Sequence, residues 1–220
     1  MTPQCIVFDI DDILFLSRDY YRSGIRAVHR YLQEEVGISG FGPRAWQRFE
    51  DLGPVDLFSE TLRIMGHRPE ETLLRTILDI YRGHEPAIGL LPDAQLCLER
   101  LYGDYALAAL TAGPIPEQHG KVEKLGIDDF CTPLVYAGDH RGDRCPGPRA
   151  FQEMERRSGF PAAASLYITD NPMELLYAQE ADFQALRIRR PGSLLEKVST
   201  PQGFEEFSSL DEFSYWLVHQ

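Results

Sequence analysis

Residues 5–14 read Cys-Ile-Val-Phe-Asp-Ile-Asp-Asp-Ile-Leu, an apolar run that ends in the three carboxylates of Asp9, Asp11 and Asp12. A short run without alternation is typical of a strand buried on both faces of a parallel sheet. Ligands of such sheets bind beyond the carboxyl ends of the strands. Crowded carboxylates repel one another unless they share a cation, and hard oxygen ligands suit Mg²⁺. The stretch therefore predicts a strand followed by a metal-binding loop, with a solvated acidic turn as the alternative.

Further apolar runs follow the same pattern through the second half of the chain. They lie at residues 105–110, 132–136, 166–168 and 185–188, and helical patterns separate them, among them 94–101, 148–158 and 172–181. Strands that alternate with helices indicate a mainly parallel sheet covered by helices. We therefore expect an α/β fold with a three-layer, Rossmann-like parallel sheet core.

One long stretch breaks this alternation. Residues 17–85 follow the first strand and carry helical apolar spacing, interrupted by Gly- and Pro-containing breaks that divide the stretch into about four helices. An insertion of this size indicates a second, smaller unit. We expect residues 1–16 and 86–220 to form the α/β core and residues 17–85 to form a helical cap domain.

Two later strand ends add polar groups to the acidic loop. One predicted strand ends in Thr111-Ala112-Gly113, and another ends in Thr169-Asp170-Asn171-Pro172. Each has an ordinary structural interpretation, because Thr111 suits a turn and Asp170 or Asn171 could cap the following helix. The carboxyl ends of parallel strands meet at one edge of the sheet. Together the three ends therefore predict a magnesium site with a phosphate cradle.

With these motifs in order, the sequence resembles the haloacid dehalogenase-like (HAD) hydrolase superfamily. The first motif, Asp-x-Asp after an apolar strand, matches Asp9-Ile-Asp11. The second, a strand ending in Ser or Thr, matches Leu110-Thr111, and the fourth matches Thr169-Asp170 through Glu174. The helical insertion after the first strand is similar to a cap of this superfamily.

The resemblance implies a phosphatase that works through an aspartyl-phosphate. Asp9 would be the nucleophile, and Asp11 would act as general acid and then as general base. Mg²⁺ would be bound by Asp9, by the backbone carbonyl of Asp11 and by Asp170, while Thr111 and the N–H groups from Ala112 onward would hold phosphoryl oxygens. An acid at position 11 favours phosphate chemistry over carbon–halogen cleavage, because the dehalogenase branch lacks it.

The third motif departs from the family pattern. Its lysine position falls on Cys145, within Cys145-Pro-Gly-Pro-Arg-Ala-Phe151. Loss of a charge-assisted contact costs on the order of 1.5–3 kcal/mol. Arg144, or Arg141 nearby, could supply the missing cation, and we include Arg144 among the predicted phosphate-binding residues. The alternative is a catalytically impaired pseudophosphatase that binds a ligand or a partner.

The charge composition of the chain disfavours some classes of binding partner. The formal net charge of −12, from 22 basic and 34 acidic residues, disfavours binding to nucleic acid or to anionic membranes. Neither a signal peptide nor an apolar run of membrane-spanning length is evident, and the four cysteines form no zinc or disulfide pattern. We expect a cytoplasmic enzyme acting on a small phosphorylated molecule.

A local basic stripe stands out against this acidic background. Arg18, Arg22, Arg26 and Arg30 recur every four residues on the first predicted helix of the insertion. The stripe could hold an anionic substrate. The favoured interpretation is a solvated helix flank whose long stems cover apolar edges.

Overall fold

The computed structural model describes residues 2–137 and 146–219. The chain divides into two compact units. One contains the residues up to Ser17 and those from Ile88 onward, and the other is Arg18–Ala87. The boundaries predicted at 17 and 85 differ from these by one and two residues.

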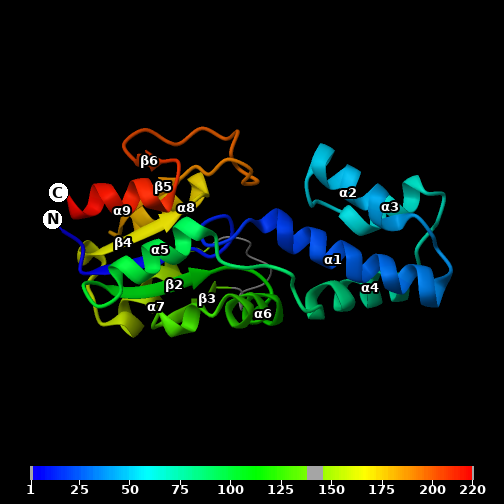
Figure 1. Ribbon diagram of the computed structural model, residues 1–220, viewed down its shortest axis with the longest axis horizontal. Coiled ribbons are helices and arrows are strands. Elements are labelled where there is room, and N and C mark those ends of the chain that lie inside the picture. The colour runs from blue at the N-terminus through cyan, green and yellow to red at the C-terminus, as the bar shows by residue number, and fades with distance from the viewer. Residues whose placement is uncertain (1, 138–145, 220) are drawn as a thin grey trace. The chain divides into compact units, whose positions relative to one another are not determined.

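The first unit is built on a parallel sheet with the strand order β3-β2-β1-β4-β5-β6 (Figure 1). The strands are β1 (Cys5–Phe8), β2 (Ala106–Thr111), β3 (Leu134–Tyr136), β4 (Ser165–Thr169), β5 (Gln184–Ile188) and β6 (Glu205–Phe207). The first five correspond to the predicted runs. The sixth was not predicted, because a three-residue edge strand with two acidic residues has no apolar run.

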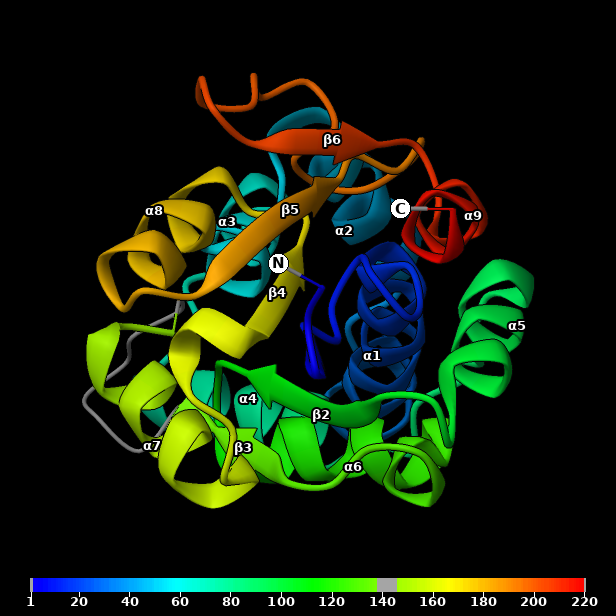
Figure 2. The ribbon, with the colours of Figure 1, turned by 90° about the vertical axis from the view of Figure 1, so that its left-hand side faces the viewer.

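Helices cover both faces of this sheet, which makes the three-layer α/β arrangement that the sequence predicts (Figure 2). One face carries α7 (Pro148–Ser158) and α8 (Pro172–Glu180), and the other carries α5 (Pro92–Leu101) and α9 (Leu210–Val218). Phe151 and Met154 of α7 pack with Val7 and Tyr167 of the sheet in a buried apolar cluster. Burial of such side chains contributes roughly 1.5–3 kcal/mol each.

A further helix, α6 (Ile115–Leu125), leaves the carboxyl end of β2 and leads through the 3₁₀ turn η2 (Ile127–Asp129) to β3. The apolar pattern of the sequence did not predict it. Its buried face contains two polar residues, Gln118 and Lys121, beside Val122 and Leu125. Polar side chains are buried in proteins when they are paired, so both require partners inside the unit.

The second unit is helical, as predicted. Its helices are α1 (Ser17–Tyr31, followed by a π-helical turn, Leu32–Val36), α2 (Phe41–Leu52), α3 (Leu57–Ile64) and α4 (Glu71–Gly83). Helices α1 and α4 lie side by side (Figure 1), and the ring of Tyr81 packs against Gly24 so closely that a Cβ there would lie 2.4 Å from it. Among the described residues, no helix has both the length and the apolar character needed to cross a membrane.

Two members of the basic stripe on α1 contact an aromatic ring of the same unit. The guanidinium groups of Arg18 and Arg22 lie 5.8 and 4.3 Å from the ring centroid of Trp46. Arg18 also pairs with Glu50 at 3.0 Å. These contacts agree with the interpretation of the stripe as a solvated helix flank whose stems cover apolar edges, since Arg22, Arg26 and Arg30 are exposed and Arg18 is half-buried.

Candidate active site

Three adjacent strands bring the predicted site residues to one edge of the sheet. Strand β1 lies between β2 and β4, with Phe8 paired in register with Ala109 and with Ile168. Asp9 follows β1 directly, Thr111 ends β2, and Asp170 follows β4 directly. The topology therefore gathers these groups from positions far apart in the sequence.

Asp9 is buried at the centre of this edge. One of its carboxylate oxygens accepts a 2.7 Å hydrogen bond from the N–H of Ile10, and the other lies 3.4 Å from the hydroxyl of Thr169. Burial, followed by the negative charges of Glu174, Asp11 and Asp170, raises the pKa of Asp9 well above its usual value. A cation beside this carboxylate would relieve both effects.

Asp170 is buried next to Asp9 on the neighbouring strand. Its Oδ2 atom has no hydrogen-bond partner in the described part of the chain. Burial, and after it the charges of Asp12 and Glu174, raises the pKa of Asp170 well above its usual value, while Arg187 opposes the shift. The capping role that the sequence left open falls to Asn171, whose side chain accepts from the N–H of Met173, so Asp170 is not needed to cap α8.

These features fit a magnesium ion bound through few protein ligands. No group of three His, Cys, Asp or Glu side chains within residues 2–137 and 146–219 could enclose a metal on its own. Mg²⁺ is usually bound through one or two carboxylates, with water and substrate phosphate completing its shell. The unpartnered oxygen of Asp170 and the crowded carboxylate of Asp9 match that requirement.

Asp11 forms an ion pair that the sequence pattern did not reveal. Both of its carboxylate oxygens lie 2.8 Å from Nζ of Lys121, a residue of α6. The hydroxyl of Ser17 also donates to Asp11, at 3.3 Å. Among the described residues, the cation that pairs with Asp11 therefore comes from the helix that follows β2.

Thr111 is held by the same helix. Its hydroxyl donates to the side-chain carbonyl of Gln118 at 2.9 Å, and both residues are buried. A Cβ on Gly113, whose φ is +132°, would lie 2.7 Å from Nε2 of Gln118. The loop Thr111–Gly113 therefore packs closely against α6, with the partly exposed Ala112 between them.

The third carboxylate of the acidic loop, Asp12, is a structural residue. It is buried and has a φ of 58°. Its two oxygens accept from the backbone N–H groups of Ser17 at 2.8 Å and Leu194 at 3.0 Å. Burial raises the pKa of Asp12 to about 6, although the hydrogen bonds from both N–H groups lower it. Backbone donors therefore hold the Asp12 carboxylate, and the predicted metal site at Asp9, Asp11 and Asp170 stays a prediction.

We expect Asp12→Ala to lower the free energy of unfolding by about 2–3 kcal/mol, because it leaves two N–H groups without acceptors and puts Ala in the left-handed region. Asp12→Asn keeps one acceptor and tolerates this backbone conformation, so it should cost less than half as much. Urea denaturation of the two variants measures the difference. Equal losses would contradict the assigned role.

Glu174 stands where the fourth motif usually has a second Asp, and it is held by protein donors. Its Oε2 accepts from the hydroxyls of Tyr167 at 2.7 Å and Thr169 at 2.8 Å, and its Oε1 accepts from the amide of Asn171 at 3.1 Å. Thr169, which replaces the usual glycine, thus lies between Glu174 and Asp9. This network fixes the end of β4 from which Asp170 projects.

Arg187 supports the same loop from β5. Its side chain is fully buried and donates to the backbone carbonyls of Asp170, Leu195 and Val198 at 2.6–2.8 Å, and to the hydroxyl of Thr200 at 2.8 Å. Burial lowers the pKa of Arg187, and the charge of Glu206 opposes this shift. One guanidinium therefore ties residue 170 to the segment that follows β5.

Arg187→Met should lower the free energy of unfolding by about 3 kcal/mol or more, because it leaves several buried acceptors without donors. Arg189→Met provides the matched control, since Arg189 is partly exposed and its loss should cost less than about 1 kcal/mol. Chemical denaturation monitored by circular dichroism would compare them. A similar loss in both variants would refute the role given to Arg187.

One part of the predicted phosphate site, formed by Arg144, Arg141 and Cys145, lies outside the described residues. The contact of Arg144 with phosphate stays a prediction.

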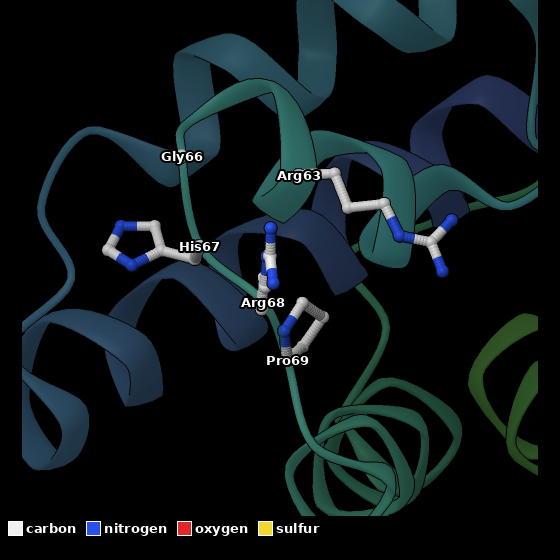
Figure 3. A pocket seen from close by; sticks show the side chains of 5 residues that line it. All are labelled: Arg63, Gly66, His67, Arg68 and Pro69. Atoms are coloured by element: carbon white, nitrogen blue, oxygen red, sulfur yellow. The ribbon is translucent and has the colours of Figure 1, made fainter.

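The second unit contains a separate hollow of about 600 Å³ at the connection from α3 to α4. Its lining residues are Arg63, Gly66, His67, Arg68 and Pro69 (Figure 3). The side chains of Arg63 and His67 point in opposite directions in this view, and both are exposed. The hollow therefore lacks the converging polar groups of a chemical site.

The sequence profile of the haloacid dehalogenase-like hydrolases matches residues 6–188 of the chain. The chain belongs to this family. The haloacid dehalogenase-like fold and the resemblance inferred from the motifs are thereby confirmed. Members of the family are enzymes, in agreement with the expectation of a hydrolase. No curated protein sequence matches the chain significantly.

Solved structures of this family match over nearly the whole chain. L-2-haloacid dehalogenase from Xanthobacter autotrophicus has 18% identity and a TM-score of 0.67, with 99% of each chain covered. YfnB from Bacillus subtilis, solved with magnesium, has 17% identity and a TM-score of 0.69, again with 99% of each chain covered. CbbY from Rhodobacter sphaeroides, solved with phosphate, has 18% identity and a TM-score of 0.66 over 97% of this chain and 96% of its own. At these identities the likeness concerns the fold alone.

Proposed function

We propose that the protein is a Mg²⁺-dependent phosphatase that hydrolyses phosphoric monoesters of a small metabolite through an aspartyl-phosphate on Asp9. The observation that carries the proposal is the set of three strand-end carboxylates, Asp9, Asp11 and Asp170, in which Asp11 is paired with Lys121. Magnesium in YfnB and phosphate in CbbY are compatible with this assignment.

In the first step, a carboxylate oxygen of Asp9 attacks phosphorus and the bond from phosphorus to the ester oxygen breaks. The departing oxygen takes a proton from Asp11. In the second step, Asp11 takes a proton from water as the water oxygen attacks phosphorus, which releases inorganic phosphate and restores the Asp9 carboxylate. A divalent cation held by Asp9 and Asp170 would offset the negative charge of the carboxylates and the phosphoryl group.

The dehalogenases among the structural relatives suggest a different substrate for the same nucleophile. Asp11 argues for phosphate chemistry, because displacement of a halide from carbon needs no proton donor for the leaving group. Phosphate esters leave as alkoxides, which do need one. The location of an acid two residues after Asp9 therefore favours the phosphatase.

A non-catalytic phosphate-binding protein is the second candidate. The observation that favours it is Cys145 at the lysine position of the third motif. Such a protein would bind inorganic phosphate and Mg²⁺ without turning over an ester.

The cysteines support placement in a reducing compartment, and we propose the cytoplasm. Cys5, Cys97 and Cys131 are free and buried, and burial raises their pKa values to about 11, 12 and 12. Thiols with raised pKa values react slowly.

One assay separates the candidates. The protein is incubated with p-nitrophenyl phosphate and a panel of sugar and other metabolite phosphates, with Mg²⁺ or with EDTA, and in parallel with L-2-chloropropionate. The proposal predicts release of phosphate that requires Mg²⁺ and no release of chloride. Chloride release would establish a dehalogenase, and phosphate binding without turnover of any ester would establish the non-catalytic protein.

A further inference from the structure

Lys121 is a buried lysine at the edge of the sheet where the candidate site lies. It is 3% exposed and comes from the face of α6 that also carries Gln118. An ammonium group is costly to remove from water unless charged or polar partners surround it. Its described partners are Asp11, at 2.8 Å from both carboxylate oxygens, and Glu117 at 3.6 Å.

The position of Lys121 on α6 places it beside the loop that ends β2. Gln118, three residues earlier on the same helix face, accepts from Thr111 and packs against Gly113. The ring of Phe15, on the segment that follows β1, lies 5.8 Å from Nζ of Lys121. Lys121 therefore lies between the loop after β1 and the loop after β2.

The positive charge of Lys121 lies at a site that otherwise contains several carboxylates. Among residues 2–137 and 146–219, Lys121 is the one basic side chain that hydrogen-bonds to a carboxylate of Asp9, Asp11 or Asp170. Arg187 contacts Asp170 only through its backbone carbonyl. A phosphate dianion that approaches three carboxylates is repelled unless positive charge is near. A lysine is a compact point charge on a flexible stem, so it can exchange one anionic partner for another.

We propose that Lys121 supplies a side-chain positive charge that binds the phosphoryl group, and that Asp11 holds Lys121 in position before the substrate arrives. This inference rests on the proposed phosphatase function for its substrate class. When the substrate binds, a phosphoryl oxygen would take the ammonium group of Lys121 as its partner in place of the Asp11 carboxylate.

Binding of inorganic phosphate with Mg²⁺, measured by isothermal titration calorimetry, tests Lys121 without requiring turnover. Lys121→Met should weaken phosphate binding about tenfold or more, the loss expected for one charge-assisted contact. Lys121→Arg should restore part of the affinity. Lys124→Met, on the exposed side of the same helix, removes an equal charge and should change the affinity by less than about twofold. With an aryl phosphate, Lys121→Met should also raise KM and lower kcat.

A purely structural role would give a different result. Lys121→Met would then lower the melting temperature while phosphate bound as in the wild type, and this outcome would overturn the inference. If Lys121→Met fails to fold, Asp11→Asn and the double variant with Lys121→Gln carry the test, because the double variant should bind phosphate about tenfold more weakly than the single one.

The two proposals fail in distinguishable ways. A wild-type protein that binds phosphate but hydrolyses no ester refutes the phosphatase and leaves Lys121 to be judged by the binding measurements. A Lys121→Met variant that hydrolyses esters as fast as an active wild type refutes the inference alone. Absence of phosphate binding in the wild type, with Mg²⁺ present, overturns the role of Lys121 directly.

Discussion

Asp9→Asn is expected to lower kcat for an aryl phosphate by at least about 10³-fold, because an amide cannot form the acyl-phosphate and loss of a nucleophile removes the covalent route. The substitution should not destabilise the protein. Asp9 is buried among Glu174, Asp11 and Asp170, which disfavour its charge, and Asn keeps the oxygen that accepts from Ile10. We therefore expect the melting temperature to stay the same or to rise.

The matched control is Asp128→Asn, which changes the net charge equally at an exposed position in η2. Its activity should equal that of the wild type. Mass spectrometry of wild-type protein quenched during turnover should detect a phosphoryl group on Asp9 that is absent from Asp9→Asn. An Asp9→Asn variant that keeps more than about a tenth of the wild-type rate would exclude the nucleophilic role.

The parts of the site that the sequence predicted share one property. Asp9, Thr111 and Asp170 each follow or end a short apolar strand, and parallel strands bring their carboxyl ends to one edge. A local pattern together with a general rule of topology is enough to place such residues. The same reasoning predicted the sheet, its helical layers and the helical insertion.

The sequence analysis did not predict Lys121 as a site residue, because the residues around it indicate neither helix α6 nor the ion pair with Asp11. The segment of α6 contains Pro116 and Gly120, which weaken a helical pattern. The ion pair joins residues that are 110 positions apart in the sequence. A lysine within a polar segment is also expected to be exposed to solvent. A signal was nevertheless present, since α6 follows directly on Thr111-Ala112-Gly113, and a helix there must pass beside the site.

Asp12 and Glu174 belong to the sequence motifs, but the motifs did not predict what their carboxylates contact. Both are acidic residues within the motifs, and for Asp12 the sequence suggested a shared cation. Asp12 instead accepts from backbone groups of Ser17 and Leu194, and Glu174 is held by Tyr167, Thr169 and Asn171. A carboxylate's role depends on the donors around it, which come from segments that a motif does not include.

Asp170→Asn should weaken Mg²⁺ binding by about 10–100-fold and lower kcat at subsaturating Mg²⁺ by a similar factor. The reason is the Oδ2 atom of Asp170, which is buried without a described partner and loses its charge in the variant. Isothermal titration of the protein with Mg²⁺ alone measures the affinity without substrate. Since the Asn171 cap and the Arg187 contacts use other atoms, we expect no loss of stability.

Asp182→Asn separates this effect from a general change in charge. Asp182 is exposed after α8 and has a φ of 61°, a conformation that Asn tolerates. Its Mg²⁺ affinity should therefore match that of the wild type. Raising the Mg²⁺ concentration should recover much of the activity of Asp170→Asn, because the remaining ligands still bind the ion when it is abundant. Unchanged Mg²⁺ affinity in Asp170→Asn would place the metal elsewhere, and the carboxylates at this edge of the sheet would then need another source of compensating charge.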